Sequence, residues 1–231
     1  MAKLLILSGA GLSAQSGIRT FRDAGGLWEE YDVMEVCSVE GYRANPSKVH
    51  AFYDARRKDL EDKMPNAAHR MIARLKGDFP EEVAVLTQNV DDLLERAGCV
   101  DVVHLHGTLT DLRCKACDAV FAVGYETQEG KKCPRCGSAH VRHHVVMFGE
   151  AAPAYETMYR ALAEAKRLVC IGTSGQVINV AWMAMQVEEA LLNNLDPDPA
   201  LDGYFTHCFH EPATEAASKI EAYCRAFLTT C

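Results

Sequence analysis

Four of the ten cysteines are spaced as metal ligands. Two residues separate Cys114 from Cys117 and Cys133 from Cys136, and fifteen residues lie between the two pairs. Two such pairs can wrap one zinc ion tetrahedrally, and four thiolates leave no coordination position open for a reactant. Disulfides or two unrelated cysteine pairs are the alternatives, and they are the weaker interpretation for an intracellular chain. We therefore predict one structural zinc ion in a zinc-binding module, residues 112–143, that is too short to have its own core.

Two histidines could supply a general base. His106 ends a predicted strand, residues 102–106, and a glycine follows it, so its imidazole could reach into a crevice and take a proton. His104 points to the same side of that strand, and the alternation of residues does not choose between the two. A strand histidine can also be only a hydrogen-bonded core residue. The terminal position favours His106 as the catalytic base.

A phenol and a guanidinium lie three residues apart in a predicted helix. Asn45 is a typical helix cap and Pro46 a typical first residue, so residues 46–60 should form a helix with Tyr53 and Arg56 on one face. Together these side chains suit a carboxylate, because arginine offers paired donors and tyrosine one more. Spacing alone favours the alternative, in which Tyr53 packs in the core and Arg56 is solvated.

The first glycine-rich segment is typical of a nucleotide-binding turn. Residues 4–7 are an uninterrupted apolar run, as in a parallel strand buried on both faces. Gly9 can turn the chain tightly, Gly11 lets a phosphate approach the backbone, and a helix from Leu12 onward would offer free N–H groups to a pyrophosphate. Ala14 occupies the third glycine position, and no strand ends in an acidic residue about 20 positions on, as a redox dehydrogenase would require. An ordinary strand-to-helix turn is an equally good interpretation.

A glycine-punctuated loop follows at residues 17–28. It carries Arg19 and Arg22 together with Phe21 and Trp28, and it could close over a ligand. Its alternative role is a surface connection with a few apolar anchors.

Polar side chains also follow the apolar run at residues 83–86. Gln88, Asn89 and Asp91 offer amide and carboxylate groups suited to ribose hydroxyls and a carboxamide. The alternative is that Asn89 or Asp91 caps the next helix.

The order of apolar runs and helices predicts an α/β fold. Besides the strands already named, we expect strands at 145–148 and 168–171, a short one ending near Asn194, and a second helix from Asn66 to Gly77. Alternating strands and helices are typical of a Rossmann-like, doubly wound parallel sheet. Small or polar residues follow most runs at once, in the segments SGAG, TQNVD, HG, FGE and GTS. These segments should converge on one crevice at the carboxyl edge of the sheet.

We expect the chain to have three parts. The Rossmann-like domain comprises residues 1–31, 82–111 and 144–231, and the zinc-binding module is inserted into it. A small helical module, residues 32–81, carries Tyr53 and Arg56.

The composition fits one large domain or a domain with an insertion. The chain has 231 residues, 48% of them hydrophobic, and a formal net charge of -8 at pH 7. This charge argues against a broad nucleic-acid surface, and a zinc ribbon that binds nucleic acid would have only Lys131, Lys132 and Arg135 as basic support. No apolar run is long enough to span a membrane, and the first residues lead directly into a strand, so we expect a cytoplasmic protein.

With these motifs the chain resembles a sirtuin, an NAD-dependent protein-lysine deacylase, over essentially its whole length. The matching segments are GAGLS at Gly9, GIRTFR at Gly17, PNAAH at Pro65, TQNVD at Thr87, HG at His106, the four cysteines, HVVMFGE at His144 and GTS at Gly172. The segment GGLW at Gly25 and the pair Tyr53 and Arg56 are similar to the bacterial sirtuins that remove negatively charged acyl groups.

The resemblance implies a reaction in which NAD is a co-substrate and is consumed. The acyl-lysine of another protein would thread between Val146 and Phe148, next to Gly149, with Tyr53 and Arg56 at the acyl end. His106 would take a proton from a ribose hydroxyl, which then attacks the acyl-derived carbon. The products would be nicotinamide, O-acyl-ADP-ribose and free lysine, from succinyl, malonyl and acetyl substrates.

The resemblance also implies which residues contact the cofactor. Asn89 and Asp91 would hold the nicotinamide end, and Asn194 and Ala213 the adenosine side. The expected contacts, with Ala10, Arg22 and Ser174 nearest the phosphates, are Gly9, Ala10, Gly11, Ser13, Ala14, Gly17, Thr20, Phe21, Arg22, Trp28, Gln88, Asn89, Asp91, Gly172, Thr173, Ser174, Asn194 and Ala213.

The chain departs from the usual sirtuin residues at several positions. The departures are His143 for proline, Asn179-Val180 for Pro-Ala, Glu211 for glycine, and a shorter segment between Trp182 and Asn194. Met147 stands where the sirtuins that remove negatively charged acyl groups often have tryptophan. Alternative functions are an NAD- or ADP-ribose-binding module without turnover and a mono-ADP-ribosyltransferase. We expect acylated lysines of other proteins as partners, no membrane or nucleic acid, and a monomer.

Overall fold

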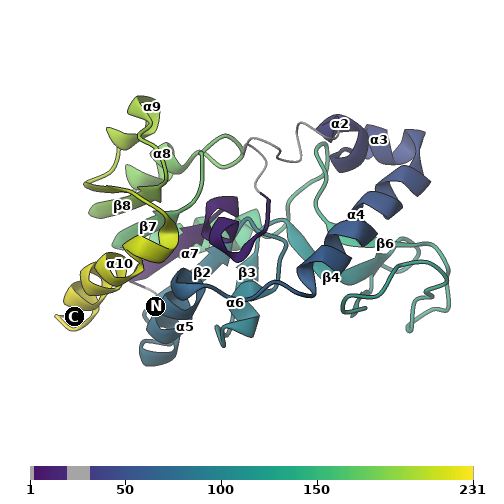
Figure 1. The fold of residues 1–231 in the computed structure, drawn as a ribbon, viewed down its shortest axis with the longest axis horizontal. Helices are drawn as coiled ribbons and strands as arrows, with labels where there is room; N and C mark the ends of the chain where they lie inside the picture. The colour runs from purple at the N-terminus through teal and green to yellow at the C-terminus, as the bar shows by residue number, and fades with distance from the viewer. Residues whose placement is uncertain (1–2, 20–31, 231) are drawn as a thin grey trace.

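The computed structural model describes residues 3–19 and 32–230 and contains two sheets of different kinds (Figure 1). Within these residues, one sheet has six strands in the order β3-β2-β1-β7-β8-β9, and each neighbouring pair is parallel. Its strands are β1 Leu4–Ser8, β2 Val83–Thr87, β3 Val103–His104, β7 Arg167–Ile171, β8 Glu189–Asn194 and β9 His207–His210. The expected Rossmann-like parallel sheet is confirmed.

Strand β1 lies at the centre of this sheet because its side chains are buried on both faces. Leu4, Leu5, Ile6 and Leu7 have no exposed surface. Successive side chains of a strand point to opposite faces, so Leu4 and Ile6 belong to one core and Leu5 and Leu7 to the other.

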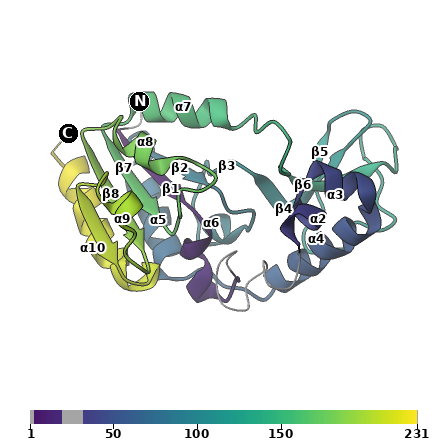
Figure 2. The same ribbon diagram turned by 90° about the horizontal axis from the view of Figure 1, so that it is seen from above.

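Helices cover both faces of the six-stranded sheet. Helices α5 Ala67–Asp78 and α10 Ala213–Leu228 pack on the core of Leu4, whereas α7 Tyr155–Glu164, α8 Val180–Ala184 and α9 Pro199–Asp202 pack on the core of Leu5. Figure 2 shows α7 and α10 on opposite sides of the sheet. The doubly wound arrangement therefore holds, although the sequence pattern had not indicated β9 or α10.

The second sheet is antiparallel and packs against a group of helices (Figure 1). Its strands, in the order β5-β4-β6, are β4 Gly107–Cys114, β5 Val120–Ala122 and β6 Val141–Val145, and the helices are α2 Val33–Cys37, α3 Val39–Ala44 and α4 Pro46–Leu60. Phe52 and Tyr53 of α4 share a core with Leu109 of β4 and Val145 of β6. The helical module and the small sheet thus share one hydrophobic core.

Helix α4 has the predicted bounds and the predicted cap. The Asn45 side chain accepts a hydrogen bond from the backbone N–H of Lys48 at 3.0 Å, and Pro46 is the first helical residue. This cap is what Asn-Pro at the start of a helix indicates.

Two predictions about local structure were wrong. Residues 145–148 do not form a strand of the parallel sheet, because β6 ends at Val145 and pairs with β4 in the antiparallel sheet; only Phe148 makes an isolated bridge, to Ser38. The helix expected from Leu12 is replaced by two 3-10 turns, η1 Ala10–Leu12 and η2 Ala14–Ser16. A short apolar run does not reveal its pairing partner, and a glycine-rich turn does not reveal how far the following helix extends.

The first turn of α5 is tied to the turns after β1 by one asparagine. The Asn66 side-chain oxygen accepts from the backbone of Ala68 and His69, and His69 Nδ1 accepts from Asn66 N at 3.2 Å, which makes a capping box. Asn66 Nδ2 also donates to Leu12 O at 2.8 Å and to Ser16 Oγ at 3.1 Å. One buried side chain therefore both caps α5 and fixes the glycine-rich turn.

The short helix α6, Leu93–Arg96, completes the connection from β2 to β3. Among the described residues, none of the helices is both long enough and apolar enough to cross a membrane.

Replacing Asn66 by alanine should lower the free energy of unfolding by about 2 kcal/mol, because a cap and a buried tether are lost together. The exposed cap residue offers a matched control, and Asn45→Ala should cost about 1 kcal/mol. Urea denaturation of the zinc-loaded variants measures both values. Equal losses would show that the contacts of Asn66 with Leu12 and Ser16 contribute nothing.

Candidate functional site

A large cavity lies at the carboxyl ends of the parallel strands. Its volume is about 1580 Å³, which exceeds the space that a drug-sized ligand needs. Every expected site residue that the structure describes, apart from the cysteines, lines this cavity. These residues are Gly9, Ala10, Gly11, Ser13, Ala14, Gly17, Tyr53, Arg56, Gln88, Asn89, Asp91, His106, Val146, Phe148, Gly149, Gly172, Thr173, Ser174, Asn194 and Ala213. Thr20, Phe21, Arg22 and Trp28 lie outside the described residues.

Two glycine turns form one wall of the cavity. The Gly11 N–H donates to Gly172 O at 2.9 Å, and a Cβ on Gly11 would lie 2.6 Å from Gly172 Cα. Gly172 has φ +65, and a Cβ there would lie 2.4 Å from the backbone nitrogen of Leu12. Packing of the turn after β1 on the turn after β7 therefore requires glycine at both positions, independently of any phosphate.

Polar side chains join the ends of β2, β7 and β8 in this wall. Gln88 Nε2, after β2, donates to Thr173 Oγ1 at 2.9 Å, and Asn194 Nδ2, at the end of β8, donates to Thr173 O at 3.0 Å. Ala213, the first residue of α10, is buried at the same edge. The segments TQNVD and GTS and the end of β8 therefore meet, as the sequence predicted.

A buried network joins Ser13 to three polar side chains. The Ser13 hydroxyl donates to Asp91 Oδ2 at 2.9 Å and accepts from Asn89 Nδ2 at 3.2 Å. His69 Nε2 lies 3.2 Å from the same hydroxyl and donates to it, because His69 Nδ1 is an acceptor in the capping box. Burial lowers the pKa of His69 to about 4, so this imidazole is neutral.

Asp91 is held from two sides within this network. Burial raises the pKa of Asp91, and the hydrogen bonds from Leu93 N and Ser13 oppose that rise. Because Asp91 Oδ1 accepts from Leu93 N at 3.1 Å, next to α6, the capping alternative is also partly correct.

The predicted strand 102–106 is shorter than expected, because β3 ends at His104 and His106 lies in the turn after it; the contacts of the two histidines separate their roles. His106 Nδ1 donates to Gln88 O at 3.1 Å, so Nε2 carries the lone pair, and burial lowers the pKa of the ring. His104 has both nitrogens engaged, with Asn89 O at 2.9 Å and Glu95 Oε1 at 2.8 Å. Burial disfavours its charged form, but the Glu95 carboxylate and Asn89 carbonyl raise its pKa. Of the two, only His106 presents a basic nitrogen to the cavity.

Tyr155, at the start of α7, is a site residue that sequence reasoning missed. Its hydroxyl lies 2.9 Å from His106 Nε2 and donates to it. No spacing rule connects residues 49 positions apart, so the sequence carried no signal for this contact. A ligand hydroxyl that reaches Nε2 must replace the Tyr155 hydroxyl.

Tyr53 and Arg56 of α4 line the other end of the same cavity. Tyr53 is 5% exposed, and burial raises its pKa well above the usual value, so it remains a phenol. Cys37, whose thiol also raises the pKa of Tyr53, is another cavity residue that the sequence had not singled out. The Arg56 guanidinium lies 5.7 Å from the centre of the Phe52 ring, and burial lowers its pKa. Tyr53 is thus core-facing, as the alternative held, but Arg56 faces the cavity.

Residues 146–149 cross between the two ends of the cavity. Val146 N donates to His106 O at 2.9 Å, and Phe148 N donates to Cys37 O at 2.8 Å. Phe148 remains 43% exposed, and Gly149 has φ +90. The segment therefore connects the region of the base with the region of Tyr53, although it is not part of the parallel sheet.

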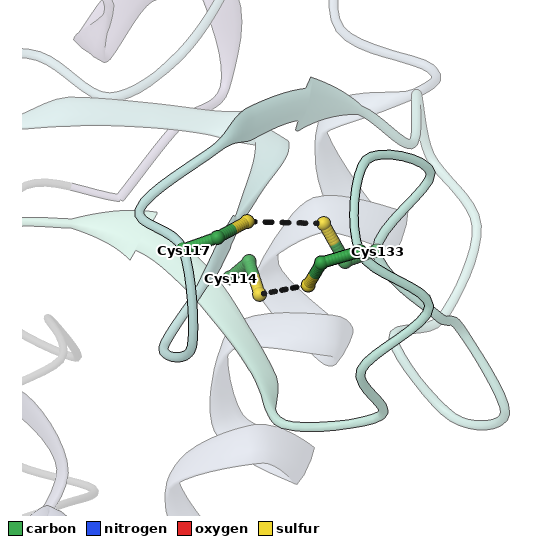
Figure 3. A group of neighbouring side chains, drawn as sticks. Cys114, Cys117 and Cys133 are labelled. Carbon is green, nitrogen blue, oxygen red and sulfur yellow. Dashed lines mark hydrogen bonds between the residues drawn. The ribbon is translucent and has the colours of Figure 1, made fainter.

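The four patterned cysteines converge in the zinc-binding module. Figure 3 shows the sulfur atoms of Cys114, Cys117 and Cys133 facing one another. The Sγ atoms of Cys114 and Cys136 are 3.6 Å apart, as are those of Cys117 and Cys133, and all four lie within 4.8 Å of one another. A zinc–thiolate bond of about 2.3 Å places tetrahedral sulfurs about 3.8 Å apart, whereas a disulfide needs about 2 Å. The cluster fits one structural zinc.

Known proteins match this chain along most of its length. The Sir2 family model matches residues 9–179. A protein of Campylobacter jejuni named NAD-dependent protein deacylase is 53% identical over 220 residues, which cover 95% of this chain and 94% of that protein. A protein of the same name from Escherichia coli strain K12 is 40% identical over 92% of this chain and 78% of its own length.

The chain belongs to the Sir2 family. Solved Sir2 structures agree in fold: a mutant Sir2 homologue in complex with ADP-ribose superposes with a TM-score of 0.86 at 33% identity, over 98% of this chain and 93% of that one. A Sir2 homologue in complex with NAD gives a TM-score of 0.85 at 33% identity, over 98% and 90% of the two chains.

The departures of this Sir2 chain near β8 have local structural roles. Asn179 caps α8 by accepting from Trp182 N at 2.9 Å, and α8 is five residues long. Glu211 N donates to Asn194 O at 3.1 Å, and its carboxylate lies 2.7 Å from Lys219 Nζ. These substitutions therefore leave the end of β8 in place.

Removing one thiolate from the cysteine cluster of this Sir2 chain should abolish zinc binding. We expect about one zinc per chain in the parent protein and none in Cys133→Ala, because three remaining thiolates bind far more weakly. Zinc is measured by plasma mass spectrometry on the purified protein.

The matched control for this experiment is Cys208→Ala. Cys208, Asp202 and His210 are a second group whose ligand atoms lie close together, but His210 Nε2 already lies 3.2 Å from Asp202 Oδ2. The control should keep its zinc. Full zinc content in Cys133→Ala would contradict the four-cysteine site.

Proposed function

We propose that this Sir2-family chain is an NAD-dependent protein-lysine deacylase that removes succinyl- and malonyl-type groups as well as acetyl groups. The observation that carries the proposal is one cavity that holds both a neutral His106 and the pair Tyr53 and Arg56. The products would be nicotinamide, O-acyl-ADP-ribose and free lysine.

The residues around the glycine turns fit a dinucleotide. NAD, when bound, supplies the ADP-ribose that accepts the acyl group, with nicotinamide as the leaving group. The backbone around Ala10 and Ser174 would contact the phosphates, Asn89 and Asp91 the nicotinamide end, and Asn194 the adenosine side. Support for this assignment comes from the cavity lining and from the many polar groups that line the strand ends.

His106 would act as the general base. Its Nδ1 proton is held by the Gln88 carbonyl, which leaves the Nε2 lone pair directed to the cavity. Since burial lowers its pKa, the ring is neutral near pH 7 and can take a proton from a ribose hydroxyl that replaces the Tyr155 hydroxyl.

Arg56 and Tyr53 would recognise an acidic acyl group. A partly buried guanidinium attracts a carboxylate more strongly than an exposed one, because less water competes. Tyr53 adds a donor that stays protonated. An acetyl group needs neither side chain, so the same site can also accept a neutral substrate.

The partners of this enzyme would be acylated lysines of other proteins. One related solved structure at 25% identity and TM-score 0.81 contains a deacetylated p53 peptide and 3′-O-acetyl-ADP-ribose. Cytoplasmic location, a monomeric state and the residue bounds of the three parts of the chain stay predictions.

Nicotinamide release sustained over many turnovers should require both an acyl-lysine peptide and His106. With matched acetyl- and succinyl-lysine peptides, His106→Tyr should lower the turnover number by at least about 100-fold, because proton transfer to the base is lost. His207→Tyr, an exposed histidine on β9, is the matched control and should keep the parent rate.

The alternatives give different results in this assay. A binding module would bind NAD without releasing nicotinamide when peptide is present. A mono-ADP-ribosyltransferase would place the label of NAD on a protein side chain instead of on the released acyl group. Either result, from a folded and zinc-loaded chain, would refute the deacylase proposal.

Replacing Arg56 by methionine should lower kcat/KM for succinyl-lysine at least about 30-fold, because a charge pair in a partly buried site is lost. The value for acetyl-lysine should change less than about threefold, since no charge is paired there. Lys58→Met, on the exposed face of the same helix, is the control. We call Tyr53 and Arg56 the selector, because they would recognise an acidic acyl group. Equal losses of kcat/KM for both substrates would refute this role.

A further inference from the structure

The residue next to the proposed selector Arg56 is a buried arginine whose contacts all lie on α4 or the small sheet with its loops. Arg57 has no exposed surface. Its Nε donates to Leu109 O, its Nη1 to Asp54 Oδ1 at 3.1 Å and Glu126 O at 3.0 Å, and its Nη2 to His143 Nδ1 at 2.7 Å. A buried guanidinium is tolerated only when its donors are paired, so these contacts define one position for this turn of α4.

Asp54, one turn earlier on α4, binds a loop of the zinc-binding module. Its carboxylate accepts from Thr127 Oγ1 at 2.7 Å and from Gln128 N at 3.0 Å, in addition to Arg57. The loop at 126–128 follows β5 and leads to the zinc ligand Cys133. Helix α4 is therefore fastened to the module that the metal holds together.

His143 on β6 touches both this arginine and the selector tyrosine. It is 1% exposed, and its ring centre lies 5.2 Å from that of Tyr53, with the ring planes 35° apart. Burial, together with the Arg57 charge, lowers the pKa of His143 to about 2, so the ring is neutral and Nδ1 can accept from Arg57.

We propose that Asp54, Arg57 and His143 form a latch that positions Tyr53 and Arg56 for an acidic acyl group. The latch residues are positioning residues: the Tyr53 ring lies against the His143 ring, with ring centres 5.2 Å apart, and α4 is fixed by Arg57. The inference rests on the proposed function, because it assigns the carboxylate contact to Tyr53 and Arg56.

The latch should affect acidic acyl groups more than neutral ones. A hydrogen bond to a carboxylate weakens steeply when donor and acceptor lose their alignment, whereas a methyl group contacts its surroundings without such directionality. If the latch contacts were lost and α4 could move, KM for succinyl-lysine would therefore rise, while KM for acetyl-lysine would stay nearly unchanged.

Two substitutions test the latch in the zinc-loaded full chain. His143→Leu removes the acceptor for Arg57 and should raise KM for succinyl-lysine about tenfold, and His143→Asn, which can place an oxygen near the position of Nδ1, should restore most of it. Thr127→Val acts at an exposed residue, so it folds even where His143→Leu does not, and it should raise the same KM about threefold. In both, KM for acetyl-lysine should change less than about twofold.

The control and a second measurement keep this test separate from the proposed function. Ser138→Ala lies in the same module, away from α4, and should leave both KM values unchanged. Amide hydrogen exchange across residues 50–60 should be faster in Thr127→Val than in the parent protein, whatever the acyl preference.

The outcomes distinguish the two ideas. Suppose that Arg56→Met lowers kcat/KM for succinyl-lysine much more than for acetyl-lysine, but that neither Thr127→Val nor His143→Leu raises KM for succinyl-lysine selectively. The latch is then refuted and the selector stands. If Arg56→Met does not separate the two substrates, the selector is refuted and hydrogen exchange decides the latch: faster exchange in Thr127→Val retains it as a support for α4, and unchanged exchange overturns it.

Discussion

The close contact of two backbones, where the turn after β1 meets the turn after β7, is the constraint on which the rest of the site depends. Gly11 donates to Gly172 O, and a Cβ at either position would collide with the facing backbone. Because no side chain separates the turns, the residues that follow each strand reach the same wall of the cavity. The strand order reverses between β1 and β7, which is where open parallel sheets form their crevice.

Burial then determines the chemical state of the groups that face this crevice. His106 is partly buried with its Nδ1 proton bound to a carbonyl, so it is a neutral base whose Nε2 lone pair faces the Tyr155 hydroxyl. His104, two residues earlier, has a carboxylate partner and a raised pKa. The two imidazoles have the same intrinsic pKa, and their surroundings shift it in opposite directions.

Two different parts of the molecule form the two ends of the cavity. The parallel sheet supplies the glycine turns and His106, whereas α4 and the small antiparallel sheet supply Tyr53 and Arg56. Residues 146–149 connect the two, since Val146 binds the backbone of His106 and Phe148 that of Cys37. In the proposed latch, the position of α4 relative to the zinc-binding module would decide how well the site recognises an acidic acyl group.

The sequence by itself determined the elements that local patterns encode. The buried run of β1 predicted a central strand, Asn45-Pro46 predicted the start of α4, and the spacing of the cysteines predicted one four-thiolate site, because each depends on residues close in the chain. The convergence of the strand-end segments followed from the general geometry of parallel sheets. These patterns sufficed for the fold class, and the family resemblance added many of the residues that line the cavity.

Only the tertiary structure decided pairings between distant segments. It placed residues 141–145 in an antiparallel sheet, put the Tyr155 hydroxyl on His106 and chose His106 over His104 as the basic nitrogen. It also joined Arg57 to His143, 86 positions away. The physical reason is that a hydrogen-bond partner and a degree of burial are properties of the packed chain, and local periodicity contains neither.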